Sequence, residues 1–155
     1  MANYAPSTRA RIADLITGMR VDKAAIAVAA ISTKSLFTVV GGNCLVVGLI
    51  GEVTTIIETQ ADATKYISTP TVGSAVDLCS AVDITAQEVG GLLTITGVLA
   101  TAAVKGTAGA GVMMANSIVV APGVIGLNTA ADNTGAMKFS IWYVPLEDGA
   151  YIEAA

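Results

Sequence analysis

The sequence predicts an all-β protein, arranged as an antiparallel β-sandwich or a jelly-roll-like domain. Valine, isoleucine and threonine make up nearly a third of the residues, and these β-branched side chains fit a pleated sheet better than a helix. Short apolar or alternating runs are separated by turns that contain glycine or proline, as in a sandwich of many short strands. We expect residues 1–20 to form an N-terminal arm or short helix and residues 21–155 to form a single β-domain.

The N-terminal segment holds the best helix candidate of the chain. Ile12, Leu15 and Ile16 fall on one face of a helix over residues 7–18, and Gly18 stands where that helix would end. This helix would precede every predicted strand, so the segment stands apart from the β-domain.

The same segment is basic. All three arginines of the chain, Arg9, Arg11 and Arg20, lie in the first twenty residues, where Asp14 is the one acidic residue. Two interpretations stay open. The segment is either a solvated terminus or a basic arm that docks on an acidic surface of a partner.

The β-domain begins with an ambiguous segment. Over residues 22–31 alanine favours a helix, whereas Ile26 and Val28 favour a strand, and we expect a strand. Glycine-, proline- and asparagine-containing turns divide the rest of the chain. The remaining strands are expected at residues 35–40, 44–59, 64–68, 76–84, 92–99, 117–121, 124–129, 136–144 and 150–153.

Alternation of apolar and polar residues predicts which side chains face the core. Residues 76–84 alternate well enough for one continuous strand, with Val76 on its apolar face. Residues 92–99 alternate in the same way and are expected to point Leu99 inward.

Two strands carry apolar side chains on a second face. Residues 44–50 are apolar on both faces, which is typical of a strand buried on two sides. In residues 136–144, Trp142 falls on the face opposite the phenylalanine, isoleucine and tyrosine of that strand. Both faces are covered within the subunit, or the second face is a contact between subunits with the tryptophan as its anchor. On the second interpretation, Trp142, Val46 and Ile50 are the candidate interface residues.

The composition indicates a subunit of an assembly. The chain is 54% apolar and only 13% charged, against about 25% charged residues in typical soluble domains. A domain of this length buries only about 68–70% of the surface that its unfolded chain exposes, so we expect further apolar surface to lie against other chains.

The net charge of −4 argues against bulk attraction to nucleic acid. The apolar runs are shorter than the roughly 20 residues of a spanning helix, so no membrane partner is expected.

Few residues are suited to catalysis. The chain has no histidine, which excludes a Ser-His-Asp or Cys-His site and imidazole metal ligands. Cys44 and Cys79 lie in apolar surroundings and are expected to be buried thiols. The glycine-rich run over residues 106–111 lacks the Gly-Lys-Ser/Thr ending of a phosphate-binding loop, and we expect a mobile loop over residues 101–111. We therefore predict no catalytic, cofactor-binding or metal-binding residue and no enzymatic activity.

Several segments in order resemble a known family. They are the runs 35–42, 45–55, 63–66, 70–73, 76–79 and 93–97, and the ending Trp142-Tyr143-Val144-Pro145-Leu146-Glu147-Asp148-Gly149-Ala150. Together they are similar to small virion structural proteins of tailed bacteriophages, over roughly residues 33–152. The resemblance implies a capsid-associated β-domain, often oligomeric, with no residues of assigned role to transfer.

The first functional hypothesis is therefore a capsid decoration (cement) protein that binds the phage head as a small oligomer, expected to be a homotrimer. Its partners would be the major capsid protein and itself, on the virion surface, after assembly in the host cytoplasm. On this hypothesis, Arg9, Arg11 and Arg20 are the candidate capsid-docking residues.

A phage tail or fibre subunit is the alternative of the same class. A ligand- or glycan-binding β-module is the alternative of another class, and it would need exposed aromatic side chains.

Overall fold

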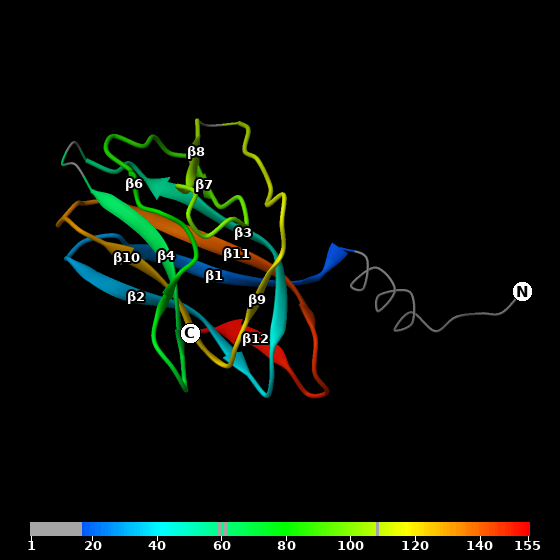
Figure 1. Cartoon of the computed structure of the whole chain (residues 1–155). Coiled ribbons are helices and arrows are strands. Elements are labelled where there is room, and N and C mark those ends of the chain that lie inside the picture. The colour runs from blue at the N-terminus through cyan, green and yellow to red at the C-terminus, as the bar shows by residue number, and fades with distance from the viewer. Residues whose placement is uncertain (1–16, 59, 61, 108) are drawn as a thin grey trace, which may run out of the picture.

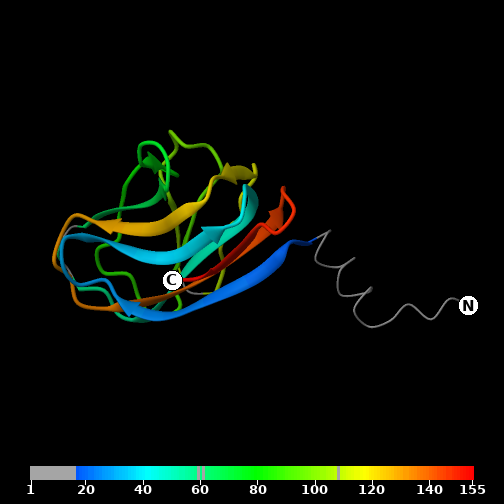
Figure 2. The same ribbon diagram turned by 90° about the horizontal axis from the view of Figure 1, so that it is seen from below.

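Alternating side chains along the longer strands build two antiparallel sheets that pack face to face. The computed structural model describes residues 17–155 except residues 59, 61 and 108, and it shows a β-sandwich (Figures 1 and 2). Sheet A has the order β1 (Met19–Ala27), β11 (Ala136–Pro145), β3 (Cys44–Thr55), β7 (Leu92–Thr94), β8 (Val104–Gly106), and β9 (Ile118–Val120) also pairs with β3. Sheet B has the order β12 (Tyr151–Ala154), β2 (Ser32–Val40), β10 (Gly123–Thr129), β4 (Ala63–Pro70), β5 (Val76–Asp77), and β6 (Val82–Asp83) also pairs with β4. The expected antiparallel β-sandwich is confirmed.

The strand β11 follows its sequence pattern closely. Met137, Phe139, Ile141 and Tyr143 are all buried in the core between the sheets, as their alternation predicts. Trp142 points to the opposite, outer face of sheet A and is half-buried. Because β11 pairs with β1 on one side and β3 on the other, this strand fixes which face of sheet A belongs to the core.

The boundary expected between residues 20 and 21 falls inside a strand. β1 begins at Met19, and Arg20 is already paired with Trp142 of β11. Residues 7–16 of the predicted helix, like Arg9 and Arg11, lie outside the described residues. Gly18 has φ of 81°, a left-handed conformation that glycine adopts without strain, directly before β1.

A predicted turn carries the chain from one sheet to the other. The turn Gly41-Gly42-Asn43 connects β2 in sheet B to β3 in sheet A, so these strands do not pair as a hairpin. Gly41 has φ of 79°, and a Cβ there would lie 2.3 Å from the carbonyl oxygen of Gly149. A turn sequence read alone does not distinguish a hairpin from a change of sheet, because both reverse or redirect the chain in a few residues.

Two predicted strands are shorter than their alternation suggests. The segment 76–84 is divided into β5 and β6, and Val76 is 47% exposed. The strand expected at 92–99 ends at Thr94, and Leu99 is 43% exposed instead of facing the core. Gly97 has φ of 85° and lies so near Asn116 that a Cβ would overlap its carbonyl oxygen, which turns the chain away from the sheet.

A buried tyrosine connects the two sheets. Tyr66 of β4 is fully buried, and its hydroxyl donates a hydrogen bond to the Leu93 carbonyl of β7 at 3.1 Å. Its ring meets Phe139 of β11 edge to face, with centroids 6.3 Å apart and planes at 88°. The hydroxyl reaches sheet A because Gly51 has no side chain, since a Cβ there would lie 2.7 Å from the Tyr66 oxygen. Burial raises the pKa of the Tyr66 phenol, so the hydroxyl stays protonated and donates.

We expect Tyr66→Phe to lower the free energy of unfolding by about 0.5–1.5 kcal/mol, because a fully buried hydrogen bond to the Leu93 carbonyl is lost. Urea denaturation followed by far-ultraviolet circular dichroism measures this change. Tyr151→Phe is the matched control, because Tyr151 is 42% exposed and should change stability by less than about 0.5 kcal/mol. Equal stabilities of the two variants would contradict the role assigned to this hydrogen bond.

Candidate subunit-contact surface

The outer face of sheet A carries an apolar row that crosses three strands. Val119 of β9 lies opposite Leu45 of β3, and Leu45 lies opposite Val144 of β11. The residues next to them along the strands, Val120, Val46 and Tyr143, are buried in the core. Because side chains alternate between the faces of a strand, Val119, Leu45 and Val144 point away from the core. Val119 is 58% exposed, and Leu45 and Val144 are half-buried.

Trp142 extends this row toward β1. It lies opposite Gly48 of β3 on one side and Arg20 of β1 on the other. A Cβ at Gly48 would lie 2.6 Å from the Met113 methyl and 3.3 Å from the Trp142 ring, so this glycine lets both side chains lie close to the sheet. The Arg20 guanidinium carbon is 5.2 Å from the indole centroid, a cation–π contact that contributes about 0.5–1 kcal/mol at exposed sites.

We call Leu45, Val47, Val119, Trp142 and Val144 the outer-face patch. All five contribute apolar side chains to the outer face of sheet A, and all five are exposed or half-buried. An aromatic anchor surrounded by aliphatic side chains is the arrangement found at the energetic centres of protein interfaces.

Polar side chains that pair with one another occupy the adjoining part of the same face. The Arg20 Nε is 2.8 Å from Asp22 Oδ1, and the Ser140 hydroxyl donates to the same oxygen at 2.5 Å. The Ser140 hydrogen bond, followed by the Arg20 contacts, holds the pKa of Asp22 below its usual value. On the same face, the Nζ atom of Lys138 in β11 is 3.0 Å from the Oε2 atom of Glu52 in β3. The charges are therefore matched within the subunit.

Arg20 lies in β1 and not in a separate arm. Its guanidinium stacks on Trp142 and pairs with Asp22, and its side chain is 57% exposed, so its role as a candidate docking residue stays a prediction. Arg9 and Arg11, the other two candidate docking residues, lie outside the described residues.

The two candidate interface residues of β3 separate onto opposite faces. Val46 is only 2% exposed and belongs to the core, so its assignment to a subunit interface is wrong. The register between β3 and β11 shifts at Val47, where Gly48 and Val46 lie opposite consecutive residues. This bulge keeps Val46 inward and leaves Ile50 half-buried on the outer face, opposite Ser140. Ile50 therefore remains a candidate.

Sequence reasoning missed four members of the patch. Val144 lies two residues after Trp142 and so on the same face by alternation, but it is not among the predicted contacts. Leu45 lies within a run that is apolar on both faces. Val47 and Val119 depend on the bulge and on the pairing of β9 with β3. No local sequence signal reports such long-range register.

The remaining candidate groups offer little chemistry. Cys44 and Cys79 are free and buried, as expected, and burial raises the pKa of both thiols. Thiols that stay protonated are poor nucleophiles and metal ligands. Within residues 17–155, leaving out 59, 61 and 108, no group of three or more cysteine, aspartate or glutamate side chains is placed to hold a metal ion. In that same part of the chain, no helix is long and apolar enough to span a membrane.

Comparison with known proteins gives no relative. No family model matches the chain, and no match is found among curated proteins or among solved structures.

We expect Trp142→Ala to lower the free energy of unfolding of the dissociated subunit by about 1–2 kcal/mol, because a half-buried ring and its Arg20 contact are lost. Its chain neighbour Ile141 is fully buried on the inner face, so Ile141→Ala should cost about 2–5 kcal/mol. Denaturant titrations at concentrations where the subunits are separate compare the two. A larger loss for Trp142→Ala would show that the indole belongs to the core.

Proposed function

We propose that this protein is a non-enzymatic structural subunit of a virion, specifically a decoration (cement) protein on the head of a tailed bacteriophage. The observation that carries the proposal is the outer-face patch, an apolar surface with an aromatic anchor, on a chain in which only 13% of the residues are charged. The resemblance in segment order, from the β2 region to the Trp142–Ala150 ending, supports the same class.

The proposed activity is mechanical. A homotrimer would use the patch for contacts between copies and bind the major capsid protein on the virion surface, after assembly in the host cytoplasm. Each contact would gain roughly 25 cal/mol per Å² of apolar surface removed from water. Many copies on one shell multiply modest contacts, because linked sites bind with a high effective concentration.

Binding to separated virion parts tests this proposal. Fluorescently labelled full-length protein is mixed with purified heads and, separately, with purified tails of particles that lack it, and bound protein is measured by sedimentation. We expect saturable binding to heads in a fixed ratio to the shell protein. Binding to tails alone would replace the proposal with a tail or fibre subunit, and binding to neither would reject a virion role.

Trp142→Ala should weaken association between copies by about 2–4 kcal/mol, the range of interface hot spots, which is roughly 30- to 1,000-fold. Analytical ultracentrifugation measures the change. Val72→Ala is a suitable control, because Val72 is 89% exposed on the turn between β4 and β5, away from sheet A. Unchanged association of the Trp142 variant would remove the patch from the contact.

A further inference from the structure

The chain enters the folded domain at the rim of the outer-face patch. Gly18 packs so closely on this face that a Cβ there would lie 2.9 Å from Cγ2 of Val47 and 3.1 Å from the backbone nitrogen of Tyr143. Val47 belongs to the patch, and Tyr143 directly precedes Val144. The sixteen residues before Thr17 are therefore attached where the apolar surface begins.

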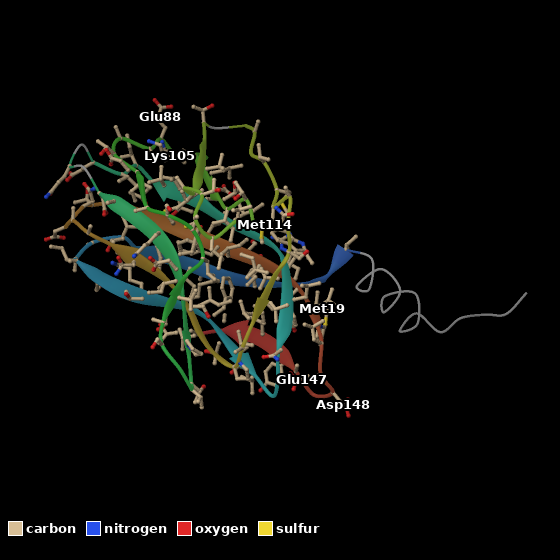
Figure 3. All side chains as sticks on the ribbon, viewed as in Figure 1. Met19, Glu88, Lys105, Met114, Glu147 and Asp148 are labelled. Atoms are coloured by element: carbon tan, nitrogen blue, oxygen red, sulfur yellow. The ribbon has the colours of Figure 1, made fainter. Side chains whose placement is uncertain are left out.

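Two carboxylates lie at the same end of the patch. Glu147 and Asp148 are exposed in the turn that follows β11, three and four residues after Val144. Figure 3 places them at the same end of the molecule as Met19. Within the described part of the chain, neither side chain pairs with a lysine or arginine, although Glu147 Oε1 accepts a hydrogen bond from the Asn43 backbone at 3.0 Å.

The sequence of the N-terminal segment complements these two features. Ile12, Leu15 and Ile16 are apolar, and Arg9 and Arg11 precede them. Eight residues span at most about 28 Å when extended, and neighbouring strands are about 4.8 Å apart. A segment of this length is long enough to cross β9, β3 and β11 and still bring its arginines to the turn.

We infer that residues 9–16 of a second copy of this chain bind the outer-face patch. Ile12, Leu15 and Ile16 cover the apolar row, and Arg9 and Arg11 pair with Glu147 and Asp148. The inference rests on the proposed function, which makes the patch a contact between copies, and it moves the partner of the two arginines from the shell to the neighbouring subunit. In a closed ring every copy gives one segment and receives one, so no patch stays exposed.

A disulfide trap tests whether the segment reaches another copy. The full-length variants Ile12→Cys and Val144→Cys are mixed, dissociated, reassociated and oxidised, while the buried Cys44 and Cys79 stay unreactive. We expect a covalent pair that contains one copy of each variant. Ile12→Cys mixed with Val72→Cys is the matched control and should give no such pair.

The same two substitutions in one chain separate the alternatives. A cross-link inside single chains, with none between the mixed variants, would mean that the segment covers its own subunit, and it would overturn the inference. No cross-link in either arrangement would also overturn it.

Neutralising the charges of either partner, and following association as a function of salt concentration, gives an independent readout. Arg9→Ala combined with Arg11→Ala should weaken association between copies about two- to thirtyfold at low salt, since two exposed ion pairs contribute about 0.2–1 kcal/mol each. The effect should vanish near 1 M salt, where the screening length is about 3 Å. Glu147→Gln combined with Asp148→Asn should give the same loss.

The two proposals fail in different ways. If Trp142→Ala abolishes association while the arginine pair has no effect and no cross-link forms, the segment exchange is wrong and the proposed function stands. If the full-length protein neither associates nor binds heads, the proposed function is wrong.

Discussion

The hydrogen bond from Tyr66 to the Leu93 carbonyl constrains how the two sheets meet. It is made at full burial, where a hydrogen bond is electrostatically stronger than in water, and it joins β4 of sheet B to β7 of sheet A. The ring also meets Phe139 of β11 edge to face. One side chain therefore fixes both the separation and the relative position of the sheets at the centre of the core.

The central strand β3 lacks a side chain at two points where other residues approach it closely. Glycine in a strand interior usually weakens the strand, but Gly51 makes room for the Tyr66 hydroxyl on the inner face and Gly48 makes room for Met113 and Trp142 on the outer face. The bulge at Val47 lies just before Gly48. The same strand thus admits the tyrosine that joins the sheets and supports the indole on the surface.

The parts of this fold that depend on local alternation could be predicted from the sequence. The inner and outer faces of β11 follow from it directly. The strand expected over residues 22–31 is present only as far as Ala27, and the burial of both cysteines follows from their apolar sequence neighbours. The division of 76–84 and the end of β7 could not be predicted, because they depend on contacts with segments far away, such as the approach of Asn116 to Gly97. Asp62 is another example. It is fully buried, with one carboxylate oxygen accepting hydrogen bonds from the backbone of residues 130 and 131, and its sequence neighbours do not indicate this.

The edge strand β1 of sheet A is protected against pairing with a further strand. An unpaired edge strand is a template for further strand pairing, and natural proteins block it with charges and bulges. β1 is such an edge strand, and it carries Arg20, Asp22 and Lys23 together with a register irregularity before Ile26. The outer-face patch has no comparable protection, because Arg20 and Asp22, and likewise Lys138 and Glu52, are paired with one another beside it, and Glu147 and Asp148 lie only at its end. If copies associate as proposed, β1 therefore opposes strand-to-strand pairing, and association over Trp142 would use side-chain packing of limited extent and not an extended sheet.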